Sequence, residues 1–171
     1  MTTALYIGRF QPFHNGHADA IGQIFKTGVE RIVIGIGSAE ENFIPENPLT
    51  AGERFEILEN ALQELGYSSW QYAILPIRNI HHYALWPHHV VQLCPPFSTV
   101  FSGSSIVESL WEKANIPGVS FQKLMIQKPV SATLVREKLK KNENISGLVP
   151  KSVEEWCKAH EVGERLKKIE N

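Results

Sequence analysis

The sequence predicts an α/β protein built on a parallel sheet of about five strands, with helices on both faces. Segments of strand and helix character alternate about five times along the 171 residues, as is typical of parallel sheets wound by helices. The strand-like segments are short and almost continuously apolar, as strands buried on both faces tend to be. The composition, 43% hydrophobic and 20% charged, favours one domain over residues 1–171, with helical pieces at its C-terminal end from about residue 148.

Runs of β-branched and other apolar side chains mark the expected strands. Three of the five runs end at a glycine, where a chain can turn sharply after a strand. The expected strands span residues 4–8, 31–37, 72–77, 98–103 and 119–126.

Apolar spacing and capping residues mark the expected helices. The clearest one covers residues 50–66, where Thr50 and Glu53 form a capping box and Gly66 suits the end of the helix. Ser105 and Glu108 suggest a second capping box. The apolar stripe of the 50–66 helix is expected to consist of Phe55, Leu58, Leu62 and Leu65. The other expected helices span residues 16–26, 85–93, 105–114, 131–141, 149–160 and 163–171.

This order of elements predicts where a ligand binds. In parallel sheets, ligands lie beyond the carboxyl ends of the strands, near the point where the strand order reverses. Gly8-Arg9, residues 35–38 and Ser102-Gly103 follow three of the expected strands. We therefore expect these segments to surround one crevice.

Overall charge and special segments exclude several classes of protein. The formal net charge is −1, so no global basic field favours nucleic acid. Cys94 and Cys157 are far apart, which fits a reducing compartment without a disulfide framework. No apolar run can span a bilayer, and the first residues lack the pattern of a signal peptide. We expect a cytoplasmic protein with no membrane or nucleic-acid partner.

Histidines raise the possibility of a metal site. His14 and His17 lie three residues apart, and pairs follow at 81–82 and 88–89. Zinc normally needs three or four ligands in a compact pattern, often with cysteine or carboxylate. HExxH is absent and neither cysteine is placed as a partner. We expect the four later histidines on loop and helix surface, and no metal held by protein side chains.

Two common nucleotide-binding motifs are missing. GIGSAE offers Gly35 and Gly37, but Glu40 stands where the third glycine of GxGxxG belongs and would oppose a pyrophosphate. The P-loop pattern GxxxxGK[ST] does not occur. Ordinary hydride transfer and Walker-type hydrolysis are therefore disfavoured.

The segment IGRFQPFHNGH instead suggests a cradle for phosphate. Gly16-His17 opens a helix, where backbone N–H groups and the helix dipole favour an anion. His14 precedes this helix, and Arg9 adds a permanent charge whose fork suits phosphate oxygens. A second such device follows in SATLVR, where Ser131 and Thr133 begin a helix and Arg136 lies one turn further. Serines and threonines cap many helices for structural reasons alone, but two anion devices in one sheet protein favour a polyphosphate ligand.

These segments carry a family resemblance. GRFQPFHNGH resembles the HxGH signature of the nucleotidyltransferase superfamily, and SATLVR is similar to its ISSTxxR motif. Together with GSAEENFIPENPLTAGER and ALWPHHV, they resemble the archaeal-type nicotinamide mononucleotide adenylyltransferases from about residue 5 to 152. HxGH also occurs in class I aminoacyl-tRNA synthetases, but this chain is short for one and lacks a KMSKS-like segment. The resemblance implies a Rossmann-like nucleotidyltransferase fold.

The resemblance also implies a reaction and its residues. AMP would pass from ATP to nicotinamide mononucleotide by direct in-line attack of the acceptor phosphate on the α-phosphorus, giving NAD and pyrophosphate. The implied catalytic residues are His17, His14, Arg9 and Arg136. Contacts with ATP are implied for Gly8, Arg9, Phe10, His14, His17, Gly103, Ser131, Thr133 and Arg136. Contacts with the mononucleotide are implied for Phe13, Gly37, Ser38 and Trp86, the last by stacking on the nicotinamide ring.

Cofactor, assembly and alternatives follow from the same resemblance. Mg²⁺ is expected on the ATP phosphates, and a homo-oligomer such as a hexamer is expected. Glu46 stands where many members carry an arginine, Tyr83 where an asparagine is common, and Ala132 where a glycine is common. Two alternatives remain open: within the same superfamily, a nucleotidyltransferase for another phosphate acceptor such as phosphopantetheine, and, because of Glu46 and Tyr83, a catalytically idle nucleotide-binding module.

Overall fold

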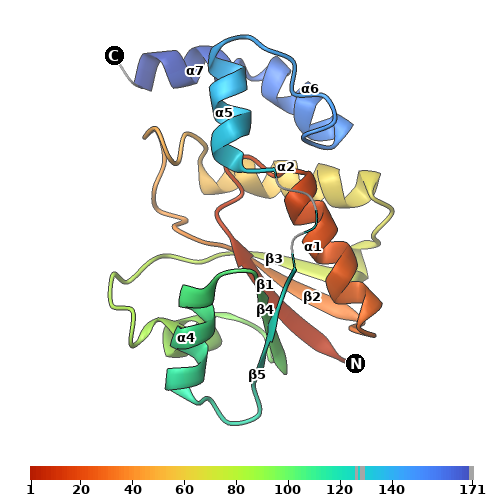
Figure 1. Ribbon diagram of the computed structural model, residues 1–171, viewed down its shortest axis with the longest axis vertical. Helices are drawn as coiled ribbons and strands as arrows, with labels where there is room; N and C mark the ends of the chain where they lie inside the picture. The colour runs from red at the N-terminus through yellow and green to blue at the C-terminus, as the bar shows by residue number, and fades with distance from the viewer. Residues whose placement is uncertain (126, 128–129, 170–171) are drawn as a thin grey trace.

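A computed structural model, which describes residues 1–125, 127 and 130–169, contains the expected parallel five-stranded sheet (Figure 1). Its strand order is β3-β2-β1-β4-β5, and every neighbouring pair is parallel. The order reverses between β1 and β4, so the ends of these strands form the switch point of the sheet. Position 126, the last of the expected fifth strand, lies outside the described residues. The strands are β1 (Thr3–Gly8), β2 (Arg31–Ile36), β3 (Tyr72–Pro76), β4 (Thr99–Ser102) and β5 (Ser120–Lys123).

Helices cover both faces of the sheet, as predicted. In Figure 1, α1 and α2 lie on one side of the sheet and α4 on the other, while α5 to α7 gather near the C-terminus. None of the helices in the described part of the chain is long and apolar enough to cross a bilayer. The helices are α1 (Asn15–Lys26), α2 (Ala51–Glu64), α3 (Trp86–Leu93), α4 (Ser105–Ala114), α5 (Ala132–Lys140), α6 (Lys151–Ala159) and α7 (Val162–Ile169), with a short 3₁₀ helix, η1 (Ser69–Gln71).

Alternation along β1 explains why the sheet needs both helical layers. Tyr6 packs into the larger apolar cluster, which includes residues of α1 and α2. Leu5 points the other way, into a second cluster with Val90 of α3 and Trp111 of α4. Successive side chains of a strand face opposite sides, so an apolar strand remains stable only when both sides are covered.

The start and end of α2 follow the prediction, but its buried face does not. Thr50 and Glu53 form the capping box, and Gly66 has a φ of 85° just after the helix. Phe55 and Leu65, expected in the stripe, are 42% and 41% exposed. The face that packs on the sheet is rotated, because a buried arginine takes part in it. Its buried residues are Arg54, Ile57, Leu58, Ala61 and Leu62.

The predicted cap of α4 is shifted by one residue. Ser104, rather than Ser105, is the N-cap, and its hydroxyl accepts a hydrogen bond from the Val107 N–H at 3.4 Å. Ser105 already has helical backbone. Two adjacent serines make the register ambiguous in the sequence, and only the backbone geometry resolves it.

The C-terminal helices share the core of the sheet. α6 packs on α2, and α7 packs on α5. Val153, Trp156 and Leu166 belong to the same apolar cluster as the α1 side of the sheet. The last two positions of the expected terminal helix, 170 and 171, lie outside the described residues.

Candidate active site

A cavity of about 390 Å³ lies beyond the carboxyl ends of β1, β2 and β4. It includes residues from all three segments that the sequence predicted around one crevice, so the predicted crevice is confirmed. Its lining consists of Ile7, Gly8, Arg9, Gly37, Ser38, Asn79, Tyr83, Trp86, Val100, Phe101, Ser102, Ile106, Val107, Leu110 and Trp111. Gly103 is exposed after β4 and is not part of this lining.

The cavity is mostly apolar and aromatic. Trp86 at the start of α3 meets Trp111 of α4 edge to face, with ring centroids 6.2 Å apart. Tyr83 and Ile106 stand at the cavity with 70% and 69% of their surface exposed. Among the described residues of the lining, Arg9 alone carries a charge. Such a compartment suits a flat, weakly polar ring, with a single cation at one end.

The two motif histidines form a stacked pair at the start of α1. Their ring centroids are 3.7 Å apart, and the backbone N–H of His14 donates to the His17 Nδ1 at 3.2 Å. Because Nδ1 of His17 is an acceptor, its neutral ring carries the proton on Nε2. Burial lowers the pKa of His14 to about 4. Burial, and secondly repulsion by His14, lower the pKa of His17 well below its usual value. Without a bound anion the pair is therefore neutral at pH 7, and His17 offers an N–H donor rather than a full charge.

Two phenylalanines of the motif support this pair from below. The Phe10 and Phe13 rings lie 4.8 and 5.5 Å from the His17 ring. The sequence reading made both residues ligand contacts, but their side chains are 1% and 0% exposed and belong to the core. Phe10 has a φ of 51°, and its ring folds back so closely that a Cβ on Gly8 would lie 2.9 Å from it. These rings pack under the histidine pair, and the ligand contacts expected of Phe10 and Phe13 stay predictions.

Two of the first three backbone amides of α1 already bond to carbonyls of the protein. The backbone N–H of Asn15 donates to the Leu148 carbonyl at 2.8 Å, and its Nδ2 donates to the Gly147 carbonyl at 2.7 Å. The His17 N–H is taken by the His14 carbonyl at 2.8 Å. Of the first three amides of the helix, the one left for an anion is that of Gly16, so the predicted cradle of free backbone N–H groups is smaller than expected.

The second predicted device lies beside the first. Ser131 caps α5 and accepts a hydrogen bond from the Leu134 N–H at 3.2 Å. Arg136 donates to the carbonyl of Gln11 at 2.9 Å and to the hydroxyl of Thr133 at 3.3 Å. The structure therefore brings the start of α5 against the loop that precedes α1.

Arg9 and Arg136 are close enough to affect each other. Burial, and secondly the positive charge of Arg9, lower the pKa of Arg136, while Glu46 opposes this effect. Repulsion between two guanidinium groups would be relieved by an anion bound between them. Since Arg9 also lines the cavity, it lies at the junction between the apolar compartment and the cationic one.

The role of the TAGER segment is visible only in three dimensions. Arg54 is fully buried and donates hydrogen bonds to six backbone carbonyls, whereas Glu53 forms an ion pair with Arg165 of α7 at 2.7 Å. Gln11 binds both the N–H and the carbonyl of Leu49 through its side-chain amide, each at 2.9 Å. In the sequence, only the presence of these charged and amide side chains hints at such contacts. Their burial and their partners are visible in the structure alone.

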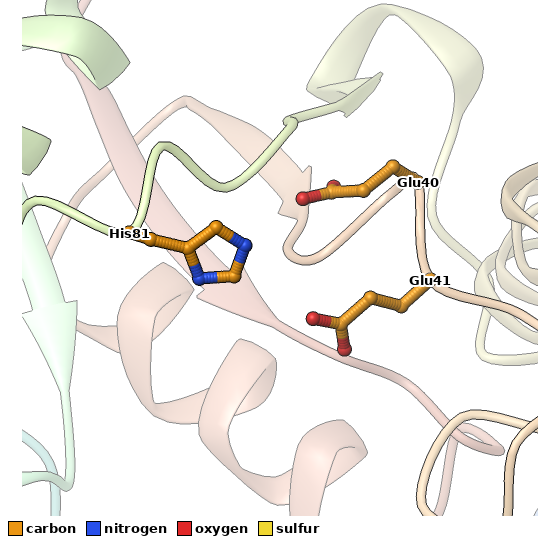
Figure 2. Close-up of side chains that lie close together, drawn as sticks. All are labelled: Glu40, Glu41 and His81. Atoms are coloured by element: carbon orange, nitrogen blue, oxygen red, sulfur yellow. The ribbon is translucent and has the colours of Figure 1, made fainter.

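One group of side chains could attract a cation. Figure 2 shows the carboxylates of Glu40 and Glu41 and the imidazole of His81 approaching one another, with ligand atoms within 4.8 Å. The group faces solvent, and the carboxylates are engaged: Glu40 accepts the Asn79 N–H at 3.1 Å, and Glu41 accepts from Asn47 at 2.6 Å. The Glu40–Asn79 bonds tie together the loops after β2 and β3, while the Glu41–Asn47 bond lies within the loop after β2. Of the paired histidines, 81, 82 and 88 are exposed as expected, and His89 binds the carbonyl of residue 78 at 3.0 Å.

Comparison with known proteins identifies the family of the chain. The cytidylyltransferase-like family model matches residues 5–138. Nicotinamide-nucleotide adenylyltransferase of Pyrococcus horikoshii is 37% identical over 169 residues, which cover 99% of this chain and 89% of that protein.

Two crystal structures of a bifunctional NMN adenylyltransferase/ADP ribose pyrophosphatase from Francisella tularensis share the fold, one of them complexed with AMP and Mn ion. Their TM-scores are 0.77 and 0.72 at 19% and 20% identity, over 98% and 97% of this chain. This chain spans 53% and 52% of those two chains, about half their length. By its family match and its near full-length relative, the chain belongs to the cytidylyltransferase-like family and, within it, to the nicotinamide-nucleotide adenylyltransferases.

Proposed function

We propose that this protein transfers AMP from ATP to nicotinamide mononucleotide and releases NAD and pyrophosphate. The observation that carries the proposal is the junction at Arg9, where an aromatic cavity meets a second guanidinium group, that of Arg136. The cavity would hold the nicotinamide riboside against Trp86, while His17, Arg9 and Arg136 would face the phosphates. A relative in Pyrococcus horikoshii that bears the name of this activity supports the assignment.

The proposed chemistry needs alignment more than proton transfer. The acceptor is a phosphate monoester whose second pKa is about 6, so at pH 7 it is already an anion and needs no general base. Its oxygen attacks the α-phosphorus of ATP in line, a new P–O bond forms, and the bond to the pyrophosphate breaks. The protein then has to hold two anions together and neutralise the charge that spreads over the triphosphate. Two guanidinium groups and the Nε2–H of His17 meet this need.

We propose that Mg²⁺ accompanies ATP. Mg²⁺ prefers oxygen ligands, and the predicted phosphate-binding side chains of Arg9, His14, His17 and Arg136 offer mainly nitrogen donors. The triphosphate oxygens and water would therefore hold the ion, which would neutralise charge on the phosphates. The Mn ion in the Francisella tularensis complex supports the use of a divalent cation. We also propose a single domain and a homo-oligomer such as a hexamer, which light scattering after gel filtration would test.

The experiment that tests the proposal is a pyrophosphate-release assay with Mg²⁺ and ATP. Nicotinamide mononucleotide, nicotinate mononucleotide and phosphopantetheine are supplied separately, and the dinucleotide product is identified by mass. We expect pyrophosphate and NAD in equal amounts with nicotinamide mononucleotide. Turnover with phosphopantetheine alone would replace the proposed acceptor, and ATP binding without pyrophosphate from any acceptor would indicate an idle nucleotide-binding module.

A further inference from the structure

Arg54 is the largest fully buried side chain among the described residues. It does not line the cavity and is not one of the predicted phosphate contacts. It lies in the first turn of α2, and its partners are backbone carbonyls. Nη1 donates to Arg9 at 3.1 Å and to Gly37 at 2.9 Å, and Nη2 donates to Ser38 at 3.1 Å. Weaker bonds of 3.2 to 3.4 Å reach the carbonyls of Thr50, Ala39 and Glu41.

The positions of these carbonyls matter more than their number. Arg9 follows β1, while Gly37 and Ser38 follow β2, and all three line the cavity. One planar guanidinium therefore connects the ends of two neighbouring strands at the place where the two substrates would meet. In the proposed function the side chain of Arg9 faces the phosphates, while its backbone carbonyl accepts a hydrogen bond from Arg54.

Burying this charge is costly, which argues that the contacts are needed. Desolvation lowers the pKa of Arg54 to about 10, while Glu40 and Glu41 oppose that shift. The group therefore stays protonated at pH 7. A guanidinium has five donors in a fixed plane, and the contacts extend from Nε through both terminal nitrogens. A lysine ammonium has three donors on one atom and cannot reproduce this spread.

We propose that Arg54 is a positioning residue for adenylyl transfer, which holds the ends of β1 and β2 at the spacing that aligns the acceptor phosphate with the α-phosphorus of ATP. This inference rests on the proposed function. Arg54 touches neither substrate in this account, because it is covered by the backbone that it binds. A displacement of about 1 Å between reacting groups can cost on the order of 10²-fold in rate, so small shifts of these loops would affect turnover before they affect folding.

The test compares Arg54→Lys and Arg54→Met with Arg165→Lys and Arg165→Met. Arg165 is a matched control, because it also combines a backbone carbonyl, that of Pro48, with a contact to α2, here through Glu53. It lies outside the cavity lining. For each variant, the folded fraction and Tm are measured together with kcat and with KM for ATP and nicotinamide mononucleotide.

We expect Arg54→Lys to fold and to lose roughly 10- to 100-fold in kcat per folded molecule, while both KM values change by less than about threefold. The Arg165 variants should lose stability but keep kcat within about threefold of the unaltered protein. Arg54→Met should follow Arg54→Lys in kcat, with a larger loss of Tm.

Three results would overturn the inference. Unchanged kcat in folded Arg54→Lys would show that the ends of β1 and β2 keep their spacing without the guanidinium group. A failure of Arg54→Lys to fold, while Arg165→Lys folds, would make Arg54 a residue of stability alone. Equal losses of kcat in both pairs of variants would show a general effect of loosening α2. If the unaltered protein releases no pyrophosphate with nicotinamide mononucleotide, the proposed function itself fails, which is distinct from these three outcomes.

Discussion

The stacked imidazoles of His14 and His17 hold a neutral N–H donor in a fixed orientation at the start of α1. The His14 N–H fixes the tautomer of His17, and the phenylalanine rings beneath limit its rotation. Because burial makes the charged form unfavourable, the ring would become protonated only when a polyphosphate compensates that cost. The permanent charges of the site are those of Arg9 and Arg136.

Removing the His17 ring should therefore affect catalysis strongly. We predict that His17→Ala lowers kcat by roughly 10²-fold, the usual cost of losing one aligned donor to a developing charge. The control is His160→Ala, because His160 stacks on Trp156 in the C-terminal part of the chain and is not part of the cavity lining. Steady-state pyrophosphate release measures both, and near-normal turnover of His17→Ala would contradict the role given to this residue.

The buried state of His14 predicts how stability depends on pH. Its folded pKa of about 4 lies below the usual histidine pKa of 6.5, so the unfolded chain takes up a proton first as the pH falls. The stability that His14 contributes is complete above pH 6.5 and is lost between 6.5 and 4. From pH 7 to pH 5, the free energy of unfolding should fall by on the order of 2 kcal/mol more in the unaltered protein than in His14→Gln. Urea titrations at both pH values measure this difference, and parallel losses would contradict it.

Substitution of Trp86 distinguishes a ring that stacks on the substrate from a ring that only packs within the protein. Its place in the cavity lining predicts that Trp86→Ala raises KM for nicotinamide mononucleotide by about tenfold, since base–aromatic stacking is worth roughly 1–3 kcal/mol, and raises KM for ATP less. Trp70 of η1, which is 61% exposed, serves as the control. Equal increases of both KM values in Trp86→Ala would indicate that the ring only packs against Trp111.

At the scale of elements, the starts of helices determine the site. The beginnings of α1 and α5 meet at one loop because Arg136 binds the Gln11 carbonyl, and the beginning of α2 carries Arg54. The sequence indicated all three starts through caps or motif residues. It could not indicate which distant carbonyls each start would meet, since partners of Arg54, Arg136 and Asn15 lie as far as 45, 125 and 132 positions away.

The shifted cap of α4 gives a prediction for two adjacent serines. Ser104→Ala should lower the free energy of unfolding by about 1 kcal/mol, because it removes the acceptor of the Val107 N–H. Ser105→Ala, the matched control, should be neutral or slightly stabilising, because Ser105 is already helical. Denaturant unfolding of both variants measures these free energies. A larger loss in Ser105→Ala than in Ser104→Ala would indicate that Ser105 is the N-cap, as the sequence suggested.

At the scale of the whole molecule, periodicity and strand-end glycines predict the sheet and its crevice, because both depend on local patterns repeated along the chain. Side chains that fill the centre are harder to predict. The ring of Phe13, a predicted ligand contact, lies in the core, and the charged side chain of Arg54 is fully buried. Both outcomes depend on how loops close over one another, which no local pattern determines.

The central claim is that one polyphosphate lies between the starts of α1 and α5 while the mononucleotide occupies the aromatic cavity. A crystal structure with nicotinamide mononucleotide and α,β-methylene ATP tests it most directly. We predict that phosphate oxygens contact Arg9, Arg136 and the Nε2 of His17, and that the pyridine ring stacks on Trp86. Phosphates bound away from these groups, or a pyridine ring outside the cavity, would contradict the account.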